Sequence, residues 1–119
     1  MQLGKRHPTT GSPADIRGAA QFGGAHPRAL PTAADGTLDL GAVRRAVRAD
    51  DPHFPVTKLL CLENTHNMCG GVVLPTAYVA DAGALAREHG LGLHLDGARV
   101  WHAADALGEP LAAVLAPAD

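Results

Sequence analysis

Apolar runs of strand length alternate with helical patterns in the second half of the chain, and this alternation limits the possible folds more than any other feature. Residues 57–62 (TKLLCL) and 91–95 (LGLHL) form two such runs. Between and after them, residues 76–89 and 98–107 place apolar side chains at helical spacing. Strand, helix, strand, helix at these lengths predicts an α/β fold, with two parallel strands joined by a right-handed crossover.

Each predicted strand leads into polar residues at its carboxyl end. The first continues into the loop ENTHNMCGG, residues 63–71, and the second into Asp96 and Gly97. Because ligands of parallel sheets bind beyond the carboxyl ends of the strands, we expect both loops to line one crevice. The residues expected to face it are Glu63, Asn64, His66, Asn67, Asp96 and Arg99.

Asp96 has the most specific chemistry of these residues. A carboxylate at a strand end is partly desolvated and needs a cationic or hydrogen-bonding partner to stay ionised. Arg99 could be that partner in an ordinary ion pair at a helix start. Alternatively, Asp96 could hold a proton on a ligand's ring nitrogen, as the pyridinium partner does in pyridoxal-phosphate enzymes. The residues alone leave both interpretations open.

His66, in the middle of the polar loop, is a candidate acid–base group. Its imidazole can accept or donate a proton near neutral pH. Asn64 and Asn67 also explain much of the loop's polarity as turn-building residues. His94 shares the strand face of Asp96, and we expect it to form part of the wall of the crevice.

Zinc coordination is the alternative from another class of protein. Cys61, His66, Cys69 and His94 would supply four suitable ligands. Cys61 and His94 fall inside predicted strands, however, and the pairs lack regular finger spacing. We therefore expect no metal site.

The first half of the chain carries weaker signals. Residues 1–13 combine turn formers with no periodicity, which predicts a disordered lead-in before one domain at residues 14–119. Residues 26–31 contain two prolines and predict at most a short edge strand. Asp39 is placed to cap a helix whose apolar face includes Val43.

Composition limits the classes of function. Ten basic residues against twelve acidic ones give a formal charge of -2 and leave no basic face for nucleic acid. No segment has the apolar length of a membrane span. We expect a cytoplasmic protein with neither nucleic acid nor membrane as a partner.

Four segments, taken together, resemble the L-threonine aldolases, which are pyridoxal-phosphate lyases of the β-eliminating lyase superfamily. They are GAAQFGGAHPR, ADGTLDL, DDPHFPVTKLLCLENTHN and HGLGLHLDGARVWHAADALG, and the resemblance covers about residues 18–119. ENTHN and HLDGAR, in this order and at family spacing, are the specific parts. The resemblance implies a partial large domain of the aspartate-aminotransferase-like fold (fold type I).

The same resemblance implies a reaction and roles for three residues. The family cleaves L-threonine or L-allo-threonine to glycine and acetaldehyde by a retro-aldol reaction. Asp96 would pair with the pyridine nitrogen of the cofactor, and Arg99 would contact it near the phenolic oxygen. His66 would lie beside the β-hydroxyl of the amino-acid substrate and assist proton removal. Family members are usually homo-oligomers.

The chain departs from the family pattern at the residues that complete the site. Thr10 stands where the family's ring-stacking histidine is expected, and the family's phosphate-binding loop has no counterpart in residues 1–12. The Schiff-base lysine would follow Asp119, and the chain's own Lys5 and Lys58 do not match it. We therefore expect either a part of a longer enzyme or an inactive truncated remnant, with a small zinc-binding or protein-binding module as a third alternative.

Overall fold

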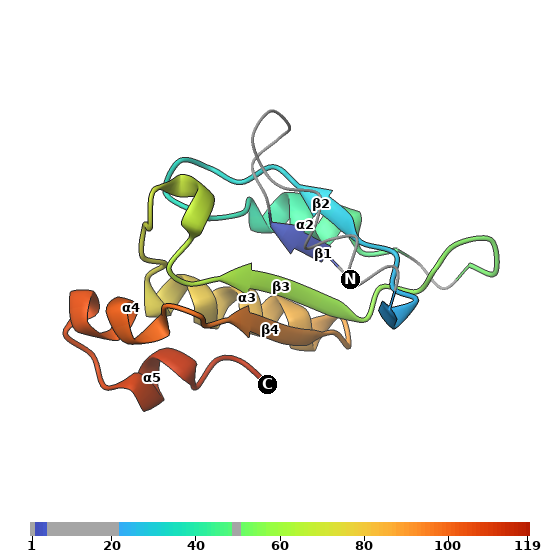
Figure 1. Cartoon of the computed structure of the whole chain (residues 1–119). Helices are drawn as coiled ribbons and strands as arrows, with labels where there is room; N and C mark the ends of the chain where they lie inside the picture. Colours follow the sequence, from blue (N-terminus) through green and yellow to red (C-terminus); the bar gives the residue numbers. More distant parts are fainter. Residues whose placement is uncertain (1, 5–21, 49–50) are drawn as a thin grey trace.

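A computed structural model of the chain describes residues 2–4, 22–48 and 51–119. At its centre is a four-stranded parallel sheet with the strand order β2-β1-β3-β4 (Figure 1). The strands are β1 (Gln2–Gly4), β2 (Arg28–Leu30), β3 (Leu59–Glu63) and β4 (Gly92–Asp96). Helices α2 (Leu40–Ala46) and α3 (Thr76–Glu88) cover one face of this sheet. The predicted α/β class is confirmed.

Strands β3 and β4 pair in parallel along their whole length, with Leu60 beside Leu93 and Glu63 beside Asp96. Leu60 and Leu93 are buried in the main core beneath α3. Because successive side chains of a strand alternate between faces, His94 and Asp96 point to the opposite, exposed face. The predicted pair of parallel strands is therefore confirmed.

Helix α3 is the crossover between β3 and β4. It buries small and branched side chains at helical spacing, namely Val79, Ala82, Leu85 and Ala86. Gly90, with a φ of +65°, ends it in the left-handed conformation that glycine adopts without strain. The hydroxyl of Tyr78 accepts from the N–H of Leu38 at 2.8 Å and donates to its carbonyl oxygen at 3.1 Å. These bonds join α3 to the segment that precedes α2.

Helix α2 begins where its cap was predicted. The side chain of Asp39 accepts a hydrogen bond from the N–H of Gly41 at 2.9 Å. Val43 is buried in the main core, as the apolar face indicated, and Ala46 is also buried. The helix ends at Ala46, before the proline at residue 52, because Val47 already has the extended angles φ -62° and ψ 123°.

The amino-terminal residues differ in part from the prediction. Strand β2 lies at the edge of the sheet, as the prolines around it indicated. Residues 2–4, which were expected in a disordered lead-in, form β1 between β2 and β3. A strand in this position can satisfy its backbone N–H and C=O groups on both sides, whatever its side-chain pattern. Residues 1 and 5–13 lie outside the described residues, so the boundary at residue 13 stays a prediction.

Two short helices follow β4 and pack on each other. Val100 and Ala104 of α4 (Val100–Leu107) form a second, smaller core with Val114 of α5 (Leu111–Leu115). After α5 the chain returns to β4, where Asp119 and Leu93 exchange two hydrogen bonds of 2.7 and 3.1 Å. Within the described ranges, no helix has both the length and the apolar character needed to cross a membrane.

The core makes a direct prediction about stability. Leu60 is fully buried between α3 and the sheet, whereas Leu115 is 38% exposed. Leu60→Ala should lower the free energy of unfolding by about 2–5 kcal/mol, because it leaves a cavity that the neighbours cannot fill. Urea denaturation measures this loss, and Leu115→Ala is the matched control with an expected loss of less than about 1 kcal/mol. Equal losses in the two variants would contradict the described core.

Candidate functional site

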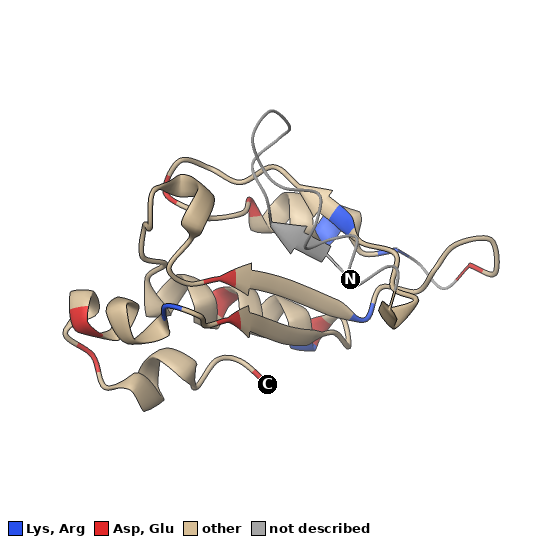
Figure 2. Ribbon diagram, in the orientation of Figure 1, with Lys and Arg blue, Asp and Glu red and all other residues tan. Residues whose placement is uncertain are grey.

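The candidate site lies at the carboxyl edge of the sheet, where β3 and β4 end side by side. Glu63 is the last residue of β3 and is in register with Asp96, the last residue of β4. The N–H of Asn64 donates to the carbonyl oxygen of Asp96 at 3.0 Å, which extends the pairing into the loops. Figure 2 shows the acidic ends of both strands and a basic segment at the start of α4. The two polar loops therefore meet, as predicted.

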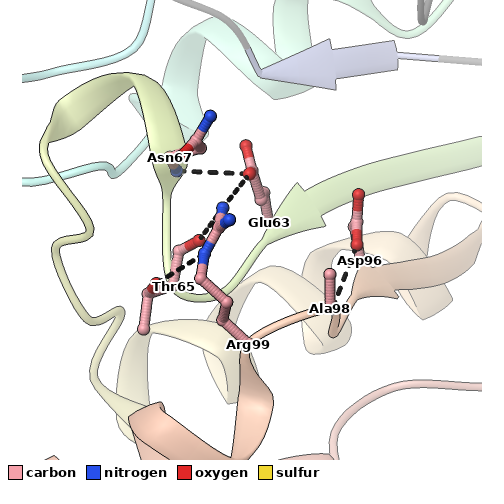
Figure 3. A network of polar contacts seen from close by, with 6 residues as sticks. All are labelled: Glu63, Thr65, Asn67, Asp96, Ala98 and Arg99. Carbon is pink, nitrogen blue, oxygen red and sulfur yellow. Dashed lines mark hydrogen bonds and ion pairs between the residues drawn. The ribbon is translucent and has the colours of Figure 1, made fainter.

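Arg99 precedes α4 and reaches across to the loop that follows β3 (Figure 3). Its Nη2 donates to Oε1 of Glu63 at 2.9 Å and to the carbonyl oxygen of Thr65 at 3.3 Å, and its Nε donates to Oγ1 of Thr65 at 3.2 Å. The spacing along the chain suggested Asp96 as the partner. Arg99 pairs with Glu63 instead, because the start of α4 directs its side chain toward the neighbouring loop.

Asp96 is exposed, which corrects the partial desolvation expected at a strand end. Its side chain projects from the face of β4 opposite the main core, where water can solvate it. Its Oδ1 accepts from the N–H of Ala98 at 3.2 Å and so stabilises the turn into α4. Among the described residues no other group hydrogen-bonds to this carboxylate. The second oxygen can therefore accept a donor from a ligand.

His66 is buried, although its position in a polar loop predicted that it would face the crevice. The residue is 2% exposed, and neither ring nitrogen has a hydrogen-bond partner among the described residues. Backbone bonds hold it in place, since its N–H donates to the carbonyl oxygen of Val72 at 2.8 Å and its own carbonyl accepts from Gly71 at 2.9 Å. None of the contacts that join Arg99 to Glu63 and Thr65 includes the imidazole. Its predicted catalytic role stays a prediction.

The other loop residues have structural roles. Asn64 is fully buried, and its side chain accepts from the N–H of Leu74 at 3.1 Å and donates to its carbonyl oxygen at 3.3 Å. The backbone N–H of Asn67 donates to Oε1 of Glu63 at 3.2 Å. The turn-building role expected of asparagine is seen at Asn64, which is buried rather than facing a crevice as predicted because its side chain is bound to Leu74. Thr65, which binds Arg99, was missed because no feature of its sequence neighbourhood distinguishes it from other loop threonines.

The paired bonds of Asn64 predict a large effect of an isosteric change. Asn64→Asp loses the donor to the carbonyl oxygen of Leu74 and places a carboxylate in a buried site. We expect it to lower the free energy of unfolding by about 2–4 kcal/mol at pH 7. Asn67→Asp makes the same change at an exposed position and should cost less than about 0.5 kcal/mol. Thermal or urea denaturation of both variants tests the assignment, which a small effect at residue 64 would refute.

The geometry does not support the zinc alternative. Within the described part of the chain, no group of three or more His, Cys, Asp or Glu side chains could hold a metal ion. Burial raises the pKa of the Cys61 thiol from 9.0 to about 11, which disfavours the thiolate that zinc requires. Cys69 is more exposed than Cys61, and its Sγ donates to the carbonyl oxygen of Ala33 at 3.5 Å.

The two thiols should differ in reactivity. In the folded chain at pH 8, we expect a disulfide reagent to modify Cys69 first and Cys61 only slowly, since the thiolate is the reactive form. Because the pKa of Cys61 is raised in the folded state, its contribution to stability is complete below pH 9 and is lost as the pH rises toward 11. Urea midpoints measured over this range should fall more steeply for the unmodified chain than for Cys61→Ala, with Cys69→Ala as the control. Equal reaction rates of both thiols before unfolding would contradict the burial of Cys61.

The sequence and structure of the chain resemble those of known proteins. Residues 12–119 match the β-eliminating lyase family. The chain belongs to this family. Membership of this family implies pyridoxal phosphate as the cofactor. The family match also agrees with the resemblance seen in the ENTHN and HLDGAR segments.

Individual relatives of this β-eliminating lyase family member are threonine aldolases. The chain is 50% identical over 94 residues to the low specificity L-threonine aldolase of Escherichia coli O157:H7, covering 79% of this chain and 27% of that protein. It is 42% identical over 106 residues to low-specificity L-threonine aldolase 1 of Arabidopsis thaliana, with 86% and 29% covered. The solved threonine aldolase of Leishmania major superposes with a TM-score of 0.71 at 29% identity, with 87% and 30% covered. The predicted fold type I domain is confirmed, and the chain spans less than a third of these relatives.

Proposed function

We propose that this chain is the cofactor-holding part of a threonine aldolase, which cleaves L-threonine or L-allo-threonine to glycine and acetaldehyde. Relatives that carry this name at 42% and 50% identity support the reaction class. The observation that carries the proposal is the register of Glu63 with Asp96, beside a bound Arg99. The proposal includes an amino-acid substrate and a cytoplasmic homo-oligomer for the longer protein.

The groups at this edge of the sheet fit pyridoxal phosphate. When bound, the cofactor supplies a protonated pyridine ring that accepts negative charge from the substrate. Asp96 would accept a hydrogen bond from the ring N–H with its exposed carboxylate, which favours the protonated form of the nitrogen. Arg99 would lie near the phenolic oxygen, where its guanidinium stabilises a negative charge.

The role of His66 rests on resemblance. Its imidazole would assist removal of the proton from the β-hydroxyl of the substrate. Burial of the ring, with 2% of the residue exposed, weighs against such contact in the present arrangement. The role therefore requires that the ring become accessible when substrate binds.

Lys58, the lysine that the structure describes, does not lie at this edge. Lys58 is exposed and directly precedes β3, so it lies at the opposite end of the strand, roughly 16 Å from the carboxyl edge. Lys5, the other lysine, lies outside the described residues. Because a covalent bond to the cofactor aldehyde needs a nearby lysine amine, we propose that residues 1–119 alone bind the cofactor without this bond and do not turn over threonine.

Titration with pyridoxal phosphate tests the role of Asp96. Quenching of the single tryptophan, Trp101 at the start of α4, can report the affinity. Asp96→Asn should weaken binding about tenfold, because it removes the charge from one hydrogen bond. Asp105→Asn is the matched control, since it makes the same change at an exposed position of α4 and should have no effect. Equal affinities of the two variants would count against Asp96 as the ring-nitrogen partner.

Borohydride reduction separates the proposal from its rivals. After incubation with pyridoxal phosphate, we expect no stoichiometric adduct on either lysine and no acetaldehyde from threonine. A defined adduct with turnover would show that the chain is a complete catalyst. An inactive remnant that has also lost its cofactor site would show no binding in the titration, and that result would overturn the proposal.

A further inference from the structure

We propose that Glu63 is a positioning residue that holds Arg99 away from Asp96 and so leaves the carboxylate of Asp96 free to bind a cationic N–H group. Neither the resemblance nor the comparisons give Glu63 a role. The consequence for cofactor binding rests on the function proposed above, whereas the position of Arg99 can be tested without any ligand.

Oε1 of Glu63 accepts two hydrogen bonds. It accepts from Nη2 of Arg99 at 2.9 Å and from the backbone N–H of Asn67 at 3.2 Å. Thr65 completes the set by accepting from Nε and Nη2 of the same guanidinium (Figure 3). Arg99 is thus bound to Glu63, at the end of β3, and to Thr65, in the loop that follows. These contacts fix the direction of its side chain.

Burial distinguishes this ion pair from the two others in the described residues. The side chains of Arg99 and Glu63 are 37% and 25% exposed, against 54% and 56% for Arg44 and Glu88. The third pair, Arg45 with Asp39, is longer, at 3.5 Å, and more exposed still. Exposed pairs contribute little because water screens them, whereas partly buried, charge-assisted hydrogen bonds hold a geometry. The Glu63 pair is therefore the one that can orient a side chain.

Because of the strand register, the direction of the Arg99 side chain affects which of two neighbouring carboxylates it neutralises. Glu63 and Asp96 end neighbouring parallel strands, so their backbones are only about 4.8 Å apart. Arg99 lies three residues beyond Asp96 along the chain, and in the described residues its ion pair is with Glu63, at 2.9 Å. The carboxylate of Asp96 has no arginine partner there and accepts a hydrogen bond only from the N–H of Ala98 among the described residues. A protonated ring nitrogen can therefore compete for Asp96 without displacing an arginine.

NMR of the ligand-free chain tests the position of Arg99 through its Nε–H signal. We expect Glu63→Gln to shift this signal, because the neutral amide no longer attracts the guanidinium and Arg99 moves toward Asp96. Asp96→Asn should leave the signal unchanged in the unmodified chain but shift it in the Glu63→Gln background. Glu63→Asp, which keeps the charge, should partly restore the original signal. The matched control is Glu88→Gln, which removes the carboxylate from an arginine–glutamate pair of similar length, 3.0 Å, elsewhere in the chain.

Pyridoxal phosphate titration of the same variants tests the consequence. Glu63→Gln should weaken binding about threefold to tenfold relative to Glu88→Gln, since Arg99 then competes for Asp96. An unchanged Arg99 signal in Glu63→Gln would overturn the positioning role, whatever the affinities. A shifted signal with unchanged affinity would overturn the consequence for the cofactor. If the unmodified chain binds no pyridoxal phosphate, the proposed function fails, and the Arg99 signal still decides the role of Glu63.

Discussion

The parallel register of β3 and β4 is the constraint on which the rest of the site depends. It is set on the buried face of the sheet, where Leu60 and Leu93 lie side by side under α3. A shift of β4 by one residue would turn Leu93 to the exposed face of His94, so the packing of the core opposes this change of register. The same register places Glu63 beside Asp96 at the carboxyl edge. Apolar packing on one face thereby determines the distance between two carboxylates at the end of the strands.

Two neighbouring carboxylates and one arginine can be arranged in more than one way. Arg99 could neutralise either acid, and the choice decides which carboxylate is left for a ligand. Hydrogen bonds that Arg99 donates to Thr65, together with the shared acceptor Oε1 of Glu63, favour the cross-strand pair over a contact with Asp96. A cation bound to three acceptors is harder to displace than one bound to a single exposed carboxylate. By binding Arg99, the loop after β3 therefore leaves the carboxylate of Asp96, at the end of β4, without an arginine partner.

Patterns that repeat along the chain predicted most of the fold, and contacts between distant segments account for what was missed. The alternation of strand and helical periods was sufficient to place β3, α3, β4 and α4, because each element buries one regular face. Strand β1 has only three residues and no such pattern. Arg99 finds its partner 36 residues away along the chain, a distance at which spacing carries no information. The burial of His66 depends on Gly36 and Val72, which pack beside it, and a polar loop gives no sign of such cover.

The two ends of the strands carry different groups. Under the proposed function, this difference separates recognition of the cofactor ring from covalent attachment to it. The carboxyl edge carries the exposed carboxylate of Asp96 and a guanidinium held by Glu63, which under that function would polarise a pyridine ring. Lys58, the lysine that the structure describes, precedes β3 at the other edge, a strand's length away and beyond the reach of its own side chain. No rotation of side chains can bring that amine to the ring, because the distance is set by the backbone of β3. Under the proposed function, the described residues carry groups for recognition of the ring, and covalent attachment requires a lysine other than Lys58.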